Sequence, residues 1–217
     1  MNALFRPLFI QSFKSSGIYL LIIALILAIS ATTALKFSNE QIQDAVALQA
    51  AEMLAADLVI TDNYPIENKW REEAKKLNLQ QSNATVFGSM AFTNDQFVMV
   101  NVKAIDDAFP LRGELKVKEN ASEKIKSGEV WLSSRAMDLL KVKVGDTLNI
   151  ADGQFKVAAE IEHDSNQELG FSAFSPTVII SQADIAKTNA IQTGSRIEHR
   201  LLLSGDAKDT KKFEQNF

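Results

Sequence analysis

The side chains that could carry out catalysis are few in this sequence and widely scattered. The two histidines, His163 and His199, lie outside any H-E-x-x-H or comparable metal-ligating spacing. No G-x-S-x-G motif is present to place a nucleophilic serine on a sharp turn. The nine glycines form neither a G-x-G-x-x-G pattern nor a Gly-Lys-Ser/Thr phosphate-binding loop. We therefore predict that the chain is not an enzyme and holds no metal or cofactor of its own.

The carboxylates and serines that stand out have simpler structural interpretations. Asp57 opens a predicted strand and Glu160 alternates out of another, so we expect both side chains to be solvated. Ser133 or Ser134 is expected to cap a short helix. The chain contains no cysteine, which excludes disulfides, iron–sulfur clusters and cysteine-based zinc sites.

The charge of the chain argues against a nucleic-acid partner. The formal net charge is -4, and the first 36 residues carry three basic side chains and no acidic one. Residues 37–217 are therefore distinctly acidic. A surface that neutralises phosphates needs clustered lysine and arginine, so we predict that the chain binds no nucleic acid.

One long apolar stretch, residues 17–35, dominates the organisation of the chain. It contains no charged residue, and as a helix it is about 28 Å long, which matches the hydrocarbon core of a bilayer. We predict a transmembrane helix here. Because Arg6 and Lys14 precede it, the positive-inside rule predicts a cytoplasmic N-terminus, with residues from about 36 onward outside the cytoplasm. A cleaved signal peptide is the alternative, although its apolar core is usually shorter.

Further helical segments flank this span on both sides. Residues 1–16 place apolar side chains at helical spacing, which predicts an interfacial helix on the cytoplasmic leaflet; a frayed first turn of the span is the alternative. Residues 36–56 are rich in alanine and are predicted to form a helical stalk. This stalk either continues the span or restarts at a cap on Ser38. Its alanine-rich surface would serve dimerisation.

The rest of the chain has the pattern of an α+β domain. Residues 57–108 read as strand, helix, strand and strand, with a hairpin turn at residues 93–95. Residues 199–217 repeat the order of a strand followed by a charged helix, and the pattern then stops. We expect the chain to be a fragment of a longer protein; a complete domain with a dangling C-terminal helix is the alternative.

The intervening residues 109–198 are predicted to be rich in strands. A hairpin turn at Asp152-Gly153 joins two of them. A short helix follows the serine cap near residue 134. Ser181 and Asp184 have the spacing of a capping box for a second short helix.

Several motifs give the chain a resemblance to a known family. They are AADLVI at the end of the stalk, VNVKAIDDAFPLRGEL, VWLSSRAMDLLKVKVGDTLNI, AFSPTVIISQADI and GSRIEHRLLLSG. Together they resemble the N-terminal part of FtsX/MacB-type ABC transporter permeases of the YbbP-like branch. The resemblance runs over essentially all 217 residues.

The resemblance implies an extracytoplasmic domain of two parts. A porter-like α+β part would comprise residues 57–108 and the start of a second half at 199–217. A β-rich, Sabre-like part at residues 109–198 would be inserted between them. ATP would be hydrolysed by a separate cytoplasmic ATPase subunit, and the permease units would work as a dimer in the bacterial inner membrane. The chain departs from the family in lacking the later spans and the cytoplasmic loop between them.

Arg112 and Arg196 are the residues for which we predict a specific role, because each lies close to a glycine at an edge of the inserted part. Each is expected to make an ion pair or carbonyl contact that holds the two parts together, or to contact a partner or substrate. Gly113 and Gly194 are expected to form turns with positive φ.

The hypothesis that follows is a permease subunit without catalysis of its own. It would couple ATP hydrolysis on its partner to movement of the periplasmic domain, for export or extraction of a substrate. The alternative is a single-pass, membrane-anchored sensor or binding protein outside the cytoplasm.

Overall fold

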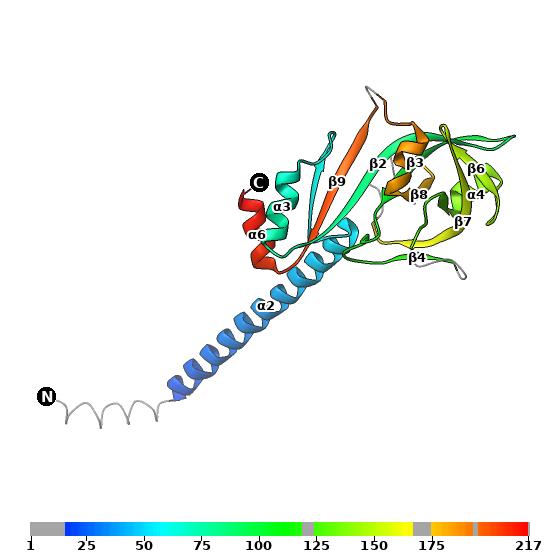
Figure 1. Ribbon diagram of the computed structural model, residues 1–217. Helices are drawn as coiled ribbons and strands as arrows, with labels where there is room; N and C mark the ends of the chain where they lie inside the picture. Colours follow the sequence, from blue (N-terminus) through cyan, green and yellow to red (C-terminus); the bar gives the residue numbers. More distant parts are fainter. Residues whose placement is uncertain (1–15, 119–123, 167–174, 193–194, 217) are drawn as a thin grey trace. The chain divides into compact units, whose positions relative to one another are not determined.

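The computed structural model describes residues 16–118, 124–166, 175–192 and 195–216 (Figure 1). The chain separates into two compact units, Met1–Gln49 and Ala50–Phe217, which are described one at a time. The predicted interfacial helix at residues 1–16 lies almost entirely outside the described residues and stays a prediction.

One helix, α2 (Ser16–Leu54), contains both the predicted span and the predicted stalk. It is not broken at Ser38, so the stalk continues the span instead of restarting. Its apolar part reaches a mean hydropathy of 2.5, and within the described residues it is the one helix long and apolar enough to cross a membrane. Leu20 and Leu27 are each more than 60% exposed, as suits side chains that meet lipid. The hydroxyl of Thr32 bonds to a carbonyl of its own helix, so it demands no outside partner.

The strands of the second unit form a single sheet. Their hydrogen-bonded order is β1-β9-β2-β3-β8-β5-β7-β4, and β6 pairs with β2 and β7. The pairs β3–β8 and β5–β7 are parallel, and the other pairs are antiparallel. The bounds are β1 (Leu58–Asp62), β2 (Gln80–Phe92), β3 (Phe97–Ile105), β4 (Leu115–Val117), β5 (Glu129–Ser133), β6 (Thr147–Ile150), β7 (Gly153–Asp164), β8 (Thr177–Ser181) and β9 (Ile197–Ser204).

The long strand β2 connects the regions that the sequence separates. Its first part pairs with β9, from Gln80↔Ser204 to Phe87↔Ile197. Its second part pairs with β3 through the predicted hairpin. Because β3 also pairs with β8, the hydrogen-bonded ladder passes from residues 57–108 into residues 109–198 without a break. The porter-like and inserted parts therefore share one sheet.

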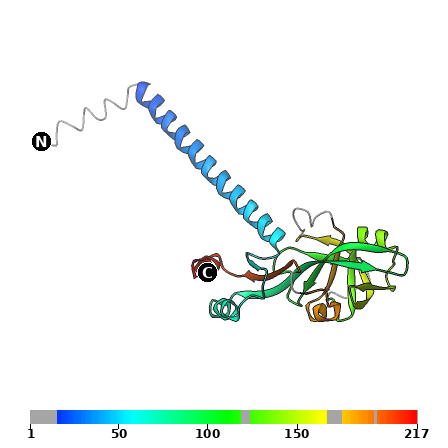
Figure 2. The ribbon, with the colours of Figure 1, turned by 90° about the horizontal axis from the view of Figure 1, so that it is seen from above.

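Two helices cover β1, β9 and β2 on one face, where they lie side by side (Figures 1 and 2). They are α3 (Asn68–Lys76) and α6 (Ala207–Asn216). Phe213 of α6 is fully buried among Ile60, Leu201 and Leu203, and its ring meets that of Trp70 edge to face at 6.1 Å. Ala74 of α3 and Leu77, just after the helix ends, pack on the same cluster, as the helical spacing of the sequence predicts.

The central part of the sheet is buried on both faces. Along β5, Val130 and Leu132 pack into one apolar cluster and Trp131 into another, because successive strand residues point to opposite faces. Helix α4 (Ser134–Leu140) covers the first cluster. The short elements η2 (Gln182–Asp184) and α5 (Ile185–Thr188) follow β8.

The two serine caps differ in outcome. Ser133, not Ser134, caps α4 by accepting a backbone hydrogen bond from its first turn at 3.3 Å. Ser181 caps η2, but the predicted capping box is wrong, because Asp184 does not bond back to the cap. Its buried carboxylate accepts hydrogen bonds from Ser127 Oγ at 2.7 Å and from the Gly128 amide at 2.6 Å. Asp184 therefore fixes a turn that is distant in sequence.

Candidate functional site at the end of helix α2

Helix α2 ends in a Schellman motif. The amide of Ala55 bonds to the Glu52 carbonyl at 3.1 Å, and that of Ala56 bonds to the Ala51 carbonyl at 3.0 Å. Ala55 has φ 58°, a left-handed conformation that costs an alanine about 1–2 kcal/mol. Both alanines are fully buried in the apolar cluster that contains Trp131, and burial of their methyl groups offsets part of this strain.

The carbonyl of Ala55 is where residues of the predicted insert bond to the helix end. It accepts backbone hydrogen bonds from Leu111 and Arg112, both at 3.0 Å. Gly113 follows with φ 73°, which confirms the prediction of a turn with positive φ at this position. A Cβ atom there would lie 2.8 Å from Cβ of Ser165 and 3.1 Å from the Glu52 carbonyl oxygen. Glycine is required both for the backbone conformation and for the close approach.

Asp57 and Arg112 form a two-pronged ion pair beside this turn. Nε of Arg112 donates to Oδ1 of Asp57 at 2.9 Å, and Nη2 donates to Oδ2 at 2.8 Å. Oδ2 also accepts from Ser204 Oγ at 2.7 Å and from the Gly205 amide at 3.0 Å. Burial by itself raises the pKa of Asp57, but the hydrogen bonds from Arg112, Ser204 and Gly205 outweigh it and bring this pKa below its ordinary value.

The expectation that Asp57 is solvated is therefore wrong. Strand alternation predicts only which way a side chain points, and it contains no information about loops that arrive from distant sequence. Here Arg112 and the end of β9 converge on the same carboxylate. Glu160 does lie at the surface, where Lys118 and Ser134 donate to its carboxylate at 2.6 and 2.5 Å and lower its pKa.

A buried lysine joins the helix end from the other side. Lys103 in β3 is 1% exposed, and its amine donates to Asp164 at 2.6 Å and to the carbonyl of Asn166 at 2.8 Å. The same amine lies 5.3 Å from the ring centre of Phe109. The side-chain amide of Asn166 in turn donates to the Met53 carbonyl, in the last turn of α2, at 2.6 Å. The buried charge of Lys103 is thereby paired with Asp164, and the Met53 carbonyl, which has no partner within the helix, receives a hydrogen bond from Asn166.

Sequence reasoning missed this second network. The one available signal is a lysine placed in the apolar strand FVMVNVKAI, where a charged side chain is buried only when it is paired. Its partners, Asp164 and Asn166, lie in a polar segment that reads as an ordinary loop.

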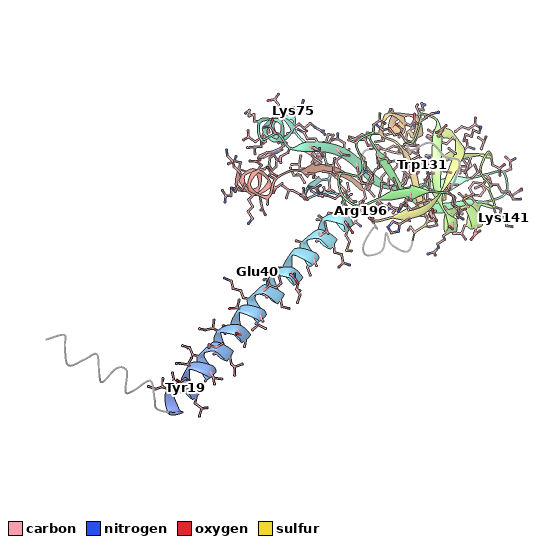
Figure 3. The ribbon with its side chains drawn as sticks, turned by 90° about the horizontal axis from the view of Figure 1, so that it is seen from below. Tyr19, Glu40, Lys75, Trp131, Lys141 and Arg196 are labelled. Carbon is pink, nitrogen blue, oxygen red and sulfur yellow. The ribbon has the colours of Figure 1, made fainter. Side chains whose placement is uncertain are left out.

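The other predicted contacts do not converge on the helix end. Arg196 is exposed (Figure 3), and within the described residues its guanidinium has no hydrogen bond or ion pair. Gly194 lies outside the described residues. The predicted roles of Arg112, Gly113, Gly194 and Arg196 between parts or toward partners stay proposals.

The ion pairs and hydrogen bonds around the end of α2 hold segments of the fold together. In the described part of the chain, no group of three or more His, Asp and Glu side chains is arranged to hold a metal ion. His163 Nε2 lies 3.3 Å from Ser165 Oγ at the exposed surface, and the same hydroxyl accepts a hydrogen bond from the Glu114 amide. An open groove of about 380 Å³ lies beside α4, between Asp138 and Lys143, and a cavity of about 50 Å³ lies beside Phe109.

Comparisons with known proteins agree with the resemblance stated above. No family model matches the chain. The "Uncharacterized ABC transporter permease YbbP" of Escherichia coli (strain K12) is 30% identical over 209 residues, which is 95% of this chain and 26% of that protein. The chain thus spans about a quarter of the length of this relative.

Two solved structures are similar. The extracellular domain of the noncanonic ABC-type transporter YknZ from Gram-positive bacteria has a TM-score of 0.50 at 10% identity, over 72% of this chain and 88% of that one. The periplasmic region of MacB from Actinobacillus actinomycetemcomitans has a TM-score of 0.48 at 16% identity, over 76% and 84%. The predicted α+β fold after an apolar helix is confirmed by the first of these. The predicted resemblance is confirmed as well: this chain resembles part of an ABC transporter permease and has the fold of that transporter class's extracellular domain.

Proposed function

We propose that the chain is the first membrane span and the extracytoplasmic domain of a permease subunit in a bacterial ABC transporter. A separate cytoplasmic ATPase subunit would bind and hydrolyse ATP, and two permease units would form a dimer. Residues 17–35 would cross the inner membrane, with the N-terminus in the cytoplasm and residues from about 36 onward outside it. The porter-like part would comprise residues 57–108 and 199–217, and the insert residues 109–198. Similarity to YbbP and the fold shared with YknZ support this proposal.

The observation that carries the proposal is the way in which the last turn of α2 is fastened. Its carbonyls at residues 53 and 55 accept hydrogen bonds from Asn166, Leu111 and Arg112, and Asp57 just beyond binds the end of β9. A flexible linker would absorb a movement of the helix. These bonds would transmit a movement of the helix to several segments of the sheet at once, which is what coupling to ATP hydrolysis requires. The movement would serve export or extraction of a substrate.

The test uses the full-length permease with its ATPase in nanodiscs. This chain has no cysteine, so once any cysteine elsewhere in the full-length protein is replaced, a single spin label at Lys75→Cys, exposed on α3, reports the distance between the two domains of a dimer. We expect ATP to change this distance distribution. Arg112→Ala should reduce the change while ATP hydrolysis continues, because the fastening is loosened and the ATPase is untouched.

Lys118→Ala is the matched control, since it breaks an exposed ion pair with Glu160 away from the helix end. An unchanged ATP response in the Arg112→Ala variant would show that the fastening does not transmit the movement. If no ATPase associates with the full-length protein, the membrane-anchored sensor becomes the better description.

A further inference from the structure

Four apolar side chains form an exposed strip on one face of the β2–β3 hairpin, which we name the Met–Phe platform. Met90 lies opposite Met99 in the ladder, and Phe92 lies opposite Phe97. Since alternate residues of a strand share a face, all four project in the same direction. Met90, Met99 and Phe97 are 43%, 61% and 70% exposed. The rings of Phe92 and Phe97 stack at 5.6 Å with an angle of 17°, which holds them in place without a partner.

The platform ends at a row that contains Gly88, Asn101 and Arg196. Gly88 lies opposite Asn101 in the next row of the same face. Asn101 is 5% exposed; its Nδ2 is itself buried and has no hydrogen-bond partner in the part of the chain that the structure describes, so it lies beneath the surface of the platform. Extending the β2–β9 register by one residue, from Phe87↔Ile197, brings Arg196 beside Gly88. The guanidinium there is exposed, with no acceptor among the described residues.

Gly88 leaves space in this row. A Cβ atom built on it would have no heavy atom within 4 Å, and its φ is not in the left-handed region. Backbone conformation therefore does not demand glycine at this position. The absence of a side chain instead leaves open space above Gly88, beside Arg196.

Apolar side chains followed by a carboxylate would satisfy this surface. Carboxylate oxygens accept from the N–H groups of an exposed guanidinium such as that of Arg196, and arginine suits them best. Methionine and aromatic residues are enriched in protein interfaces, and methionine adapts its shape to a partner. From the row of Gly88 to the row of Phe92 the platform is about 13 Å long, enough for about two turns of a helix.

A protein segment fits this surface better than a lipid or another small molecule. Sites for small molecules are concave and enclose most of the ligand, whereas the platform is an exposed sheet face. Neither of the two cavities described above includes its residues. We propose that the Met–Phe platform, with the open space at Gly88 and the cation of Arg196, docks a segment of a partner protein that presents apolar side chains next to an Asp, a Glu or a C-terminal carboxylate. This surface is distinct from the fastening of α2.

The proposal is tested with the whole chain in lipid nanodiscs and a phage-displayed library of short random peptides. Peptides selected on the wild type are synthesised, and their affinities are measured by fluorescence anisotropy. The variants are F97S/M99S and Arg196→Glu, which change exposed side chains only. Val144→Ser and Lys141→Glu are matched controls, because they change an exposed apolar residue and an exposed cation elsewhere.

We expect the selected peptides to combine apolar residues with an acidic one. Their affinity should fall about tenfold or more in F97S/M99S and in Arg196→Glu, and stay within about twofold in both controls. Selection on Arg196→Glu should favour lysine or arginine in place of the acid.

Three results would overturn the proposal. The first is a set of peptides that bind the variants as tightly as the wild type, or that lack acidic residues. The second is displacement of the peptides by lauric acid at equal concentration, which would assign the platform to an amphiphile. The third is dissociation of a wild-type dimer by F97S/M99S without peptide, seen by sedimentation, which would make the platform a contact between copies of this chain.

Discussion

The contribution of the Arg112–Asp57 ion pair at the end of α2 can be measured as the loss of unfolding free energy in Arg112→Ala. The substitution removes two charge-assisted hydrogen bonds to Asp57, each of a kind that contributes about 1.5–3 kcal/mol when shielded from water. The side chain of Arg112 is 42% exposed, so solvent screening reduces this contribution. Asp57 also keeps its bonds to Ser204 and Gly205. We expect the free energy of unfolding to fall by about 1–2 kcal/mol.

The assay is urea unfolding of the whole chain in detergent, followed by tryptophan fluorescence. Trp70 and Trp131 both lie in the unit Ala50–Phe217, so the signal reports the domain and not the membrane helix. The partner change Asp57→Asn and the double variant complete a thermodynamic cycle, from which we expect a coupling energy of about 1 kcal/mol. Lys118→Ala again serves as the control, because its ion pair with Glu160 lies elsewhere.

The pH dependence has a defined sign. The pKa of Asp57 is lower in the folded protein than in the unfolded chain, so its contribution is present above the unfolded value of about 3.9 and is lost as the pH falls through the folded value. The difference between the wild type and Arg112→Ala should therefore be full at pH 7 and shrink below about pH 4. A coupling energy below about 0.3 kcal/mol, or one that does not change over this range, would refute the reasoning.

Three other changes can be measured by the same unfolding assay. Gly113→Ala should lower the free energy of unfolding by about 2–4 kcal/mol, because it combines backbone strain with a clash against Ser165. Gly128→Ala, also at positive φ but with open space around it, should lose only the part due to backbone strain. Equal losses in the two variants would show that the clash is relieved. Phe213→Ala should cost about 3–5 kcal/mol, and a loss below about 1 would mean that α6 does not complete the core. Burial lowers the pKa of His199 despite a nearby carboxylate, so stability should fall as the pH drops below about 6.5, and His199→Gln should abolish this dependence. A wild-type slope that persists in His199→Gln would assign it to another group.

Much of the fold was predictable because its signals are local. The apolar run of α2, the Ser133 cap and the β2–β3 hairpin depend on residues that are close in sequence. Trp70 and Ala74 show the inward face of α3 by their spacing alone. The pairing of β3 with β8 could not be read in this way, because a parallel contact between distant strands leaves no local pattern.

The candidate site was only partly predictable for the same reason. Arg112 and Gly113 stand out because a glycine and a charged residue adjoin at the predicted start of the insert, and the structure places both against the end of α2. The roles of Lys103 and Asn166 depend on β3 and the end of β7 meeting the helix, which no spacing in the sequence indicates. Asp184 was misassigned because the spacing of a capping box does not show where the carboxylate bonds; here its partners are Ser127 and Gly128, which are distant in sequence.

The position of β9 has a consequence for how the protein is made. Leu58 of β1 and Gln81 of β2 both pair with Leu203, so the two strands synthesised first have their common neighbour in a much later stretch of the chain. Until β9 is in place, the facing edges of β1 and β2 are open and available for wrong pairings. Folding of this region waits for a contact with one of the longest sequence separations in the domain, which makes it intrinsically slow. With the domain outside the cytoplasm, as proposed above, a chaperone there would act on this interval, when β1 and β2 are complete and β9 has not arrived.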